Sequence, residues 1–496
     1  MTNAMRRLST RLQWASNYAA MLALVFSASA GAAELPVPDA MEVQALAERR
    51  DAQALQDYFQ RYQRAYQANP EAERPLIQTY WALRGKTDTS LDAFYDRWVE
   101  VFPQSYEARV VRANHAWARA ALIAHPRAIR GGVQSDRAWQ QYRQFLQKAR
   151  QDLETAQTLS SHPLVAQRSL IGVCRMQQDE TCAKQVYRQA VSQAPRSLAL
   201  RRVYLDGVDD RDLRTAEIAE AENQGVSVEG VRVLKAEQQL SDSRKIMRAD
   251  GGTEVAIYQG IVGSVQDPWL DESAAHMYMR RNNYAEAIPL YTRALKANPN
   301  LDDALYWRGK AYFAVGDFLA AHADTMRAAL IGNPQASRDL IDFHIRGEKG
   351  LPKDFSASAR WCSLAAQHDQ SYGAFCLGDL YANGYAGYPV DPEKSLLWMQ
   401  RAADLGHQTA QHDLGVVLLK GMNDQPPDRA AGIYWLKLSS AGGFDYATNK
   451  LRMHLSRWEY FKAITWPAYR DALMGGELSF KIVMGLLIEM VRATVG

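Results

Sequence analysis

The chain has 496 residues, of which 47% are hydrophobic, 10% aromatic and 23% charged. A chain of this length is too long to fold around one compact core, so we expect more than one domain. The composition excludes wholesale disorder, a collagen-like fibre and a polytopic membrane protein. The net charge is +3, and residues 1–32 contribute three arginines and no acid, so the rest of the chain is neutral. This charge balance gives no electrostatic sign of nucleic-acid binding, and no nucleic acid is expected as a partner.

The N-terminal segment has the pattern of a signal peptide. Arg6, Arg7 and Arg11 form the positive start, residues 19–30 form an apolar run, and Ala-Gly-Ala at residues 30–32 matches the cleavage motif. The run is shorter than the roughly 20 residues that cross a bilayer, which makes an uncleaved anchor the less favoured alternative. The sequence predicts export to the periplasm and no integral membrane span after signal cleavage.

Residues 33–163 are helical by pattern but have no clear repeat period. They contain, in order, Trp98, Pro103-Gln-Ser105, Trp117, Arg130-Gly131-Gly132 and Trp139. This order is similar to that of a bacterial domain of unknown function often found before tetratricopeptide repeats. The resemblance implies an irregular helical domain and brings no activity with it.

A repeat occurs at residues 164–197, 268–301 and 302–335, and the last two copies superpose with a shift of 34. Small residues let antiparallel helices approach closely, and Gly or Asn permits the left-handed turn between them. The shift pairs Ala275 with Gly309, Tyr278 with Tyr312, Asn282 with Gly316, Ala287 with Ala321 and Ala294 with Ala328. The pattern resembles the tetratricopeptide repeat, of which residues 164–197 are a divergent copy. Residues 198–267, between the copies, are predicted to be a helical connector.

In tetratricopeptide proteins the first helix of each pair lines a groove that receives peptides or partner helices. Carried over by this resemblance, the groove positions are Trp269, Glu272, His276, Met279 and Arg280, then Asp303, Tyr306, Lys310, Phe313 and Ala314. Aromatic rings beside Arg and Lys are frequent interface anchors. The predicted partner-binding residues are therefore Trp269, His276, Met279, Arg280, Tyr306, Lys310 and Phe313. The alternative is that the aromatic members pack against neighbouring repeats. The clamp that binds carboxyl-terminal peptides in some relatives is absent, because Glu272 and His276 occupy its key places.

A second period, of 37 residues, begins after residue 336 and extends to residue 450. It relates Trp361, Trp398 and Trp435, and it also pairs Gly378 with Gly415 and Gly406 with Gly443. This spacing resembles three copies of the Sel-one-like repeat, a relative of the tetratricopeptide repeat with a longer loop between its helices. Residues 451–496, which include an apolar segment at residues 480–491, are predicted to form capping helices. Docking of that segment on a membrane or a partner is the alternative.

The four cysteines form two local pairs, Cys174 with Cys182 and Cys362 with Cys376. Each pair straddles a predicted turn between antiparallel helices, which could bring the Cα atoms to the roughly 5.5–6 Å of a disulfide. Two disulfides fit an oxidising compartment, and four buried thiols are the alternative. No histidine or second cysteine stands at ligand spacing, so no metal is expected.

The sequence has no HExxH metalloprotease motif, no GxSxG nucleophile motif and no Gly-rich phosphate-binding loop. We therefore expect neither an enzyme nor a cofactor. We predict an all-α protein in which helix-pair repeats stack as an α-solenoid, a superhelix, after an irregular helical domain. The predicted function is an exported bacterial scaffold or adaptor that binds protein or peptide partners through its repeat groove. The alternatives are a hydrolase or binding protein acting on cell-wall glycan, and an envelope assembly factor that docks on the inner membrane through its C-terminal helix.

Overall fold

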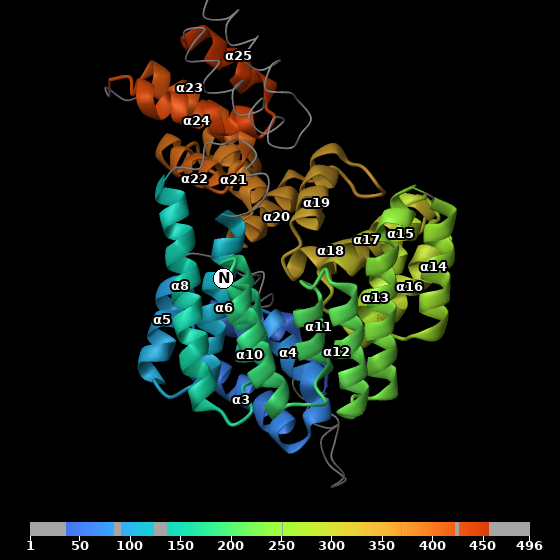
Figure 1. Cartoon of the computed structure of the whole chain (residues 1–496). Coiled ribbons are helices and arrows are strands. Elements are labelled where there is room, and N and C mark those ends of the chain that lie inside the picture. The colour runs from blue at the N-terminus through green and yellow to red at the C-terminus, as the bar shows by residue number, and fades with distance from the viewer. Residues whose placement is uncertain are drawn as a thin grey trace, which may run out of the picture. The chain divides into compact units, whose positions relative to one another are not determined.

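The computed structural model describes residues 36–83, 91–123, 136–249, 251–368, 370–421 and 426–455. Within these ranges all regular structure is helical, which confirms the all-α prediction (Figure 1). Contacts divide the chain into Met1–Pro36 and Val37–Gly496, and the described helices all belong to the second unit. The predicted signal peptide and the apolar segment 480–491 lie outside the described residues, so export and the C-terminal cap stay predictions. Among the described helices, none has the length and apolar composition needed to cross a membrane.

The N-terminal helices pack around a buried aromatic core. They are α2 (Ala40–Glu48), α3 (Ala52–Ala68), α4 (Glu73–Trp81), α5 (Asp92–Val101), α6 (Tyr106–Ile123) and α8 (Asp136–Leu159). The ring of Phe59 lies 4.7 Å from that of Tyr80 and 6.1 Å from that of Trp98. The indole nitrogen of Trp98 donates a hydrogen bond to Gln56 at 3.2 Å, which satisfies a polar atom in a core that excludes water.

The next helices fill the segment between the N-terminal domain and the 34-residue repeats. They are α9 (Leu164–Met176), α10 (Glu180–Gln193), α11 (Leu198–Leu205), α12 (Arg211–Asn223), α13 (Val228–Ala249) and α14 (Gly251–Ser264). Helices α9 and α10 are adjacent partners, and a disulfide between Cys174 and Cys182 joins them. Asp179 between them caps α10 by accepting a hydrogen bond from the Cys182 amide at 2.9 Å.

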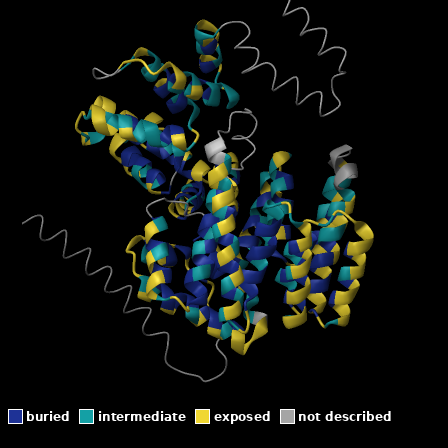
Figure 2. Ribbon diagram, turned by 60° about the vertical axis from the view of Figure 1, so that its left-hand side comes forward, coloured by how far each residue is buried: buried dark blue, intermediate teal, exposed yellow. Residues whose placement is uncertain are grey.

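The 34-residue repeats form two helix pairs, α15 (Pro268–Arg280) with α16 (Tyr284–Ala297) and α17 (Asp302–Val315) with α18 (Phe318–Leu330). A Cβ atom at Gly309 would lie 3.2 Å from the Ala321 carbonyl oxygen and 2.8 Å from the Thr325 hydroxyl, so the helices of the second pair touch there. Gly316 ends α17 with a φ of 89°, as expected for the turn residue. The buried residues lie mainly between helices and the exposed residues on their outer faces (Figure 2).

The 37-residue repeats form three further pairs and one last helix. They are α19 (Pro334–Arg346) with α20 (Phe355–Gln367), α21 (Ser371–Asn383) with α22 (Pro392–Asp404), α23 (Gln408–Lys420) with α24 (Arg429–Ala441), and α25 (Asp445–His454). The second helix of each pair begins after an aspartate, Asp354, Asp391 or Asp428, whose carboxylate accepts a backbone hydrogen bond at 2.9 Å. These caps recur at the period of 37 and fix where each helix starts. A second disulfide joins Cys362 of α20 to Cys376 of α21.

Hydrogen bonds attach the N-terminal helices to the 34-residue repeats. The side-chain amide of Gln44 in α2 donates to the Ala82 carbonyl at 3.0 Å and to the Ile331 carbonyl at 3.3 Å. Gln78 of α4 donates to the carbonyl of Ala297, the last residue of α16, at 3.5 Å. Helix α4 is therefore held beside the repeats although about 200 residues separate them in sequence.

Candidate functional site

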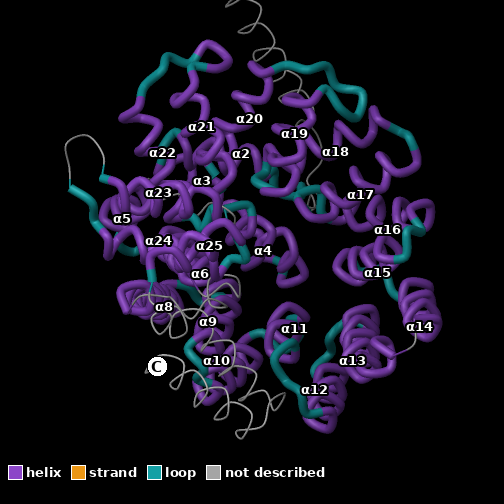
Figure 3. The backbone as a smooth tube through the Cα atoms, turned by 90° about the horizontal axis from the view of Figure 1, so that it is seen from above, coloured by secondary structure: helices purple, strands orange, loops and turns teal. Residues whose placement is uncertain are grey.

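A cavity of about 660 Å³ lies between α4, α9, α11, α13 and α15. In Figure 3, α4, α11 and α15 lie near one another when the chain is seen from above, in agreement with their shared lining of the cavity. The volume is within the roughly 300–1,000 Å³ of pockets that hold ligands. Trp81, Arg202 and Trp269 are among the lining residues, so the wall combines helices of the N-terminal domain, the connector and the first 34-residue repeat.

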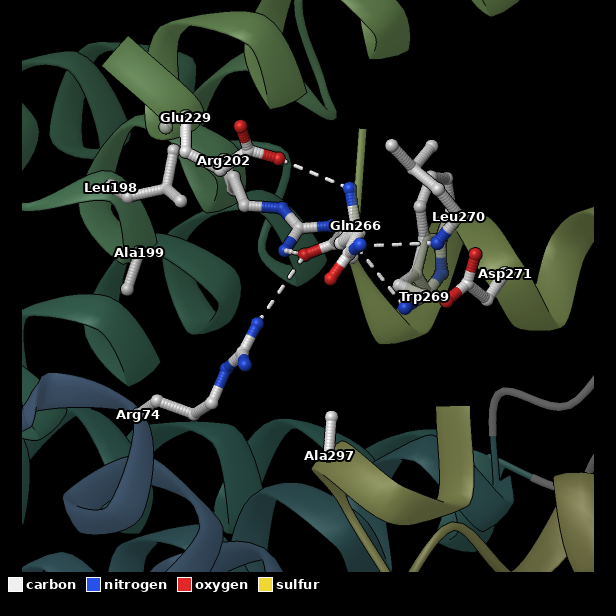
Figure 4. A network of polar contacts seen from close by, with 12 residues as sticks. Arg74, Leu198, Ala199, Arg202, Glu229, Gln266, Trp269, Leu270, Asp271 and Ala297 are labelled. Atoms are coloured by element: carbon white, nitrogen blue, oxygen red, sulfur yellow. Dashed lines mark hydrogen bonds and ion pairs between the residues drawn. The ribbon is translucent and has the colours of Figure 1, made fainter. Parts of the chain in front are cut away.

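Arg202 of α11 is the centre of a polar network in the cavity wall (Figure 4). Its guanidinium bonds Glu237 of α13 at 2.7 Å and both carboxylate oxygens of Asp267 at 3.0 and 3.1 Å. Asp267 also caps α15 by accepting from the amides of Trp269 at 3.1 Å and Leu270 at 3.2 Å. Burial raises the pKa of Glu237, and Arg202 opposes that effect. The network holds three helices in register through charge-assisted hydrogen bonds.

Glu73 fixes α4 against the start of α11. Its carboxylate accepts from the amides of Leu198 at 3.2 Å and Ala199 at 3.1 Å, and from the Ser197 hydroxyl at 2.7 Å. Burial raises the pKa of Glu73, and these three donors oppose the rise. A carboxylate at the N-terminus of a helix from another part of the chain satisfies amides that the helix itself leaves free.

Two half-exposed tryptophans line the cavity beside arginines. Trp81 is 39% exposed and Trp269 is 49% exposed. The guanidinium carbon of Arg168 lies 5.0 Å from the Trp81 ring centre, and that of Arg202 lies 5.7 Å from the Trp269 ring centre. Aromatic rings that remain accessible next to guanidinium groups are well suited to hold a peptide, because they offer both apolar area and hydrogen-bond donors.

Glu272 is a third cavity-lining carboxyl group whose pKa is raised. Burial is the main cause that raises its pKa to about 7, and the neighbouring Asp303 and Asp302 add to the rise. The side-chain amide of Asn333 donates to Asp302 at 3.1 Å and to Asp303 at 3.0 Å, so each of these carboxylates has a hydrogen-bond partner. Near neutral pH, Glu272 is therefore divided between its charged and its neutral form.

The predicted partner-binding residues of α15 occupy different surroundings. Trp269 lines the cavity. The His276 ring lies 5.5 Å from Tyr291 and 5.9 Å from Trp307, and burial lowers its pKa. Met279 is partly buried, and the exposed Arg280 pairs with Glu254 at 2.8 Å. The structure therefore places one of these four predicted residues in the cavity.

The predicted residues of α17 contact the following repeat. Tyr306 and Phe313 are each 8% exposed. The Tyr306 hydroxyl donates to Asp339 at 3.3 Å, and Lys310 pairs with the same carboxylate at 3.3 Å. The Phe313 ring lies 5.5 Å from Phe343 of α19. These contacts favour the alternative in which the aromatic members pack between repeats.

The sequence reasoning missed Arg74, Trp81 and Arg202, because none of them belongs to a repeat. One signal was available in α4. Arg74, Gln78 and Trp81 follow each other at spacings of four and three, which places them on one face of a helix. In the described part of the chain, no group of three potential metal ligands occurs.

Comparisons with known proteins agree with both periods. Residues 275–316 match a family model described as the TPR repeat. Residues 342–369, 371–407 and 408–444 match the model of the Sel1 repeat, the Sel-one-like repeat of the sequence analysis. The chain therefore contains tetratricopeptide and Sel1 repeats, as predicted, and such repeats indicate a scaffold for protein–protein interaction. The resemblance of residues 33–163 to a domain of unknown function stays a prediction.

Several solved structures are similar to this chain. A Sel1 repeat protein from Oxalobacter formigenes is 22% identical, with a TM-score of 0.36 over 47% of this chain and 99% of that one. A protective antigen of uropathogenic Escherichia coli, c5321, is 13% identical, with a TM-score of 0.37 over 88% of this chain and 97% of that one. Yeast Tom70 is 13% identical, with a TM-score of 0.29 over 91% and 99%. No curated protein matches the chain.

Proposed function

We propose that the protein is an exported bacterial scaffold that binds an extended segment of a partner protein in the cavity between α4, α11 and α15. The cavity itself carries the proposal, because it presents Trp81 and Trp269 in a partly open space bordered by arginines. The repeats supply the rigid frame, and the Arg202 network sets the relative position of the walls. A preformed site of this kind limits the entropy lost when a peptide binds.

Two features support export to the periplasm. The N-terminal segment combines Arg6, Arg7 and Arg11 with an apolar run and a small-residue cleavage motif. The two disulfides, Cys174–Cys182 and Cys362–Cys376, suit an oxidising compartment. Intact mass spectrometry of the protein recovered from the periplasm should show that residues 1–32 or 1–33 have been removed.

Binding to the cavity is tested with random peptides displayed on phage and selected on the oxidised chain after signal removal. Trp269→Ala and Trp81→Ala should each abolish the binding of enriched peptides. Trp307→Ala is the matched control, since Trp307 is 37% exposed on α17 and does not line the cavity. Retained binding by Trp269→Ala and Trp81→Ala, with unchanged melting temperatures, would contradict the proposal.

A glycan-acting protein is the second candidate, and Glu272 favours it. Its pKa of about 7 and its place beside the exposed Trp269 suit a general acid near a sugar-binding ring. This candidate predicts release of reducing ends from purified cell-wall glycan and loss of that release in Glu272→Gln. Intact glycan after prolonged incubation with the wild-type chain excludes the hydrolase.

A further inference from the structure

Arg74 brings a positive charge with spare hydrogen-bond capacity to the cavity. Its side chain is half exposed and extends from α4 toward Arg202 and the start of α15 (Figure 4). Within the described part of the chain, the contact of its guanidinium is an ion pair with Asp267 at 3.6 Å, longer than a hydrogen bond. A guanidinium carries five N–H donors in a planar fork, so most of this group's capacity remains unused.

Most acceptor positions of the Asp267 carboxylate are used by groups other than Arg74. Its Oδ1 atom accepts from the Trp269 and Leu270 amides and from Arg202, and its Oδ2 atom accepts from Arg202. Each carboxylate oxygen has about two lone-pair positions, so Oδ1 is fully used, and Oδ2 retains one position. Arg74 faces Oδ2, but the 3.6 Å separation makes the contact an ion pair and not a hydrogen bond.

Two further carboxylates of the wall, Glu73 and Glu237, are held by donors other than Arg74. Glu73 accepts from one hydroxyl and two amides at the start of α11. Glu237 accepts from Arg202. Among the described residues, the cavity thus has unused donors on Arg74, whose polar contact is the long ion pair with Asp267. A ligand that brings its own acceptor complements this wall.

We infer that the cavity selects a peptide that carries a carboxylate, which Arg74 binds as a two-pronged ion pair, next to a bulky apolar side chain that packs on Trp81 or Trp269. This inference rests on the proposed function and names the chemistry of the partner segment. The carboxylate comes either from an Asp or Glu side chain or from a free C-terminus, and the two sources present the same pair of oxygens to the guanidinium.

The test begins with peptides enriched by phage display on the oxidised, signal-free chain. Three synthetic forms of one enriched peptide are compared by fluorescence anisotropy: the parent, a form with Asp and Glu changed to Asn and Gln, and a form with an amidated C-terminus. We expect one of the two altered forms to bind about 10- to 100-fold more weakly, which identifies the source of the carboxylate. The binding of the parent should also weaken as the salt concentration rises.

Arg74 is then changed in the same oxidised, signal-free chain. Arg74→Ala should weaken the parent peptide by a similar factor, and Arg74→Glu by more. Arg74→Lys keeps the charge but loses the planar fork, so an intermediate loss is expected. Arg97→Glu is the control, because Arg97 is an exposed arginine of α5 that does not line the cavity. Melting temperatures exclude a loss caused by unfolding.

The outcomes separate this inference from the proposed function. Peptides that require Trp269 but tolerate Arg74→Ala and loss of every carboxylate would overturn the selection of an anionic segment and leave the scaffold proposal intact. Two outcomes would contradict both the inference and the proposed function. In the first, the enriched peptides bind without Trp81, Trp269 or Arg74. In the second, no peptide binds the unaltered chain better than the Trp269→Ala chain.

Discussion

The α17 face and the cavity wall use aromatic and basic side chains in different ways. On α17, Tyr306 and Phe313 are nearly buried, and Lys310 is paired with Asp339 of the next repeat. In the cavity wall, Trp81 and Trp269 remain half exposed, and the ion pair of Arg74 is long. Aromatic and basic side chains therefore hold neighbouring repeats together where the repeats are regular. The same residue types stay accessible to a ligand where irregular helices meet the first repeat.

The reason lies in how a solenoid is stabilised. Each repeat contacts its neighbours, so a groove position in the interior of the array lies close to the helix that follows. Phe313 meets Phe343 of α19 in this way. Trp269 follows the capping residue Asp267 at the start of α15, where the preceding helices are not repeats and leave a gap. The junction between irregular and regular parts is therefore where binding groups can remain free.

The largest expected effect comes from breaking the packing between repeats. Phe313→Ala removes a ring that is 8% exposed and packed against Phe343, and should lower the free energy of unfolding by about 3–5 kcal/mol. Phe318→Ala is the control in the same pair, because Phe318 is 45% exposed. Thermal unfolding followed by circular dichroism measures both. If Phe313→Ala melted at the same temperature as the unaltered chain, Phe313 would not be a packing residue.

The next effect tests the two disulfides, of which one joins α9 to α10 and the other joins the first two Sel1 repeats. They close short loops, with sequence separations of 8 and 14 residues. Replacing either pair, Cys174 with Cys182 or Cys362 with Cys376, by serine should cost about 2–3 kcal/mol. Melting of each variant, with and without a reducing agent, measures the cost. Peptide mapping without reduction should find these two pairings, and four free thiols in the periplasmic protein would refute them.

Much of the fold could be predicted from sequence, because repeats carry the information locally. The period of 34 predicts a close helix contact at Gly309, and the structure has one there. The period of 37 arises because the same turn and cap residues recur in each repeat, and Asp391 is one of these caps. The cavity could not be predicted, because it depends on Arg202 and Asp267 meeting α4 across long sequence separations. Whether Tyr306 faces a groove or the next helix also depends on the rotation between successive helix pairs. The spacing of residues in the sequence does not determine that rotation.

A smaller effect concerns Glu272 and depends on pH. Burial beside Asp303 and Asp302 raises its pKa from the usual 4.5 to about 7, so the folded state favours the protonated form. Stability attributable to this group is therefore highest below pH 4.5, falls as the pH rises to 7, and is constant above that. Glu272→Gln should stabilise the chain by about 1–2 kcal/mol at pH 8 and change little at pH 4.5, allowing for partial solvent screening.

The exposed Glu286 of α16 provides the control for this pH dependence. Glu286→Gln should change the melting temperature little at pH 8, because this side chain is exposed and a surface substitution has a small effect on stability. If Glu272→Gln shifted the melting temperature equally at pH 4.5 and pH 8, Glu272 would not titrate near neutrality in the folded chain. The glycan-acting alternative would then lose the observation that favours it.

The smallest effect on stability is expected from Lys310→Glu, which distinguishes the two regions most directly. Lys310 is paired with Asp339 at 3.3 Å, but its side chain is 38% exposed, so water and salt screen the interaction. Reversing its charge should cost less than about 1 kcal/mol. If partners bind at the cavity, the variant should bind the enriched peptides with unchanged affinity, whereas Trp269→Ala should not bind them. If Lys310→Glu weakened binding at an unchanged melting temperature while Trp269→Ala had no effect, the binding surface would be the α17 face. The buried rings of that face would then have to be interpreted as the floor of a groove rather than as packing between repeats.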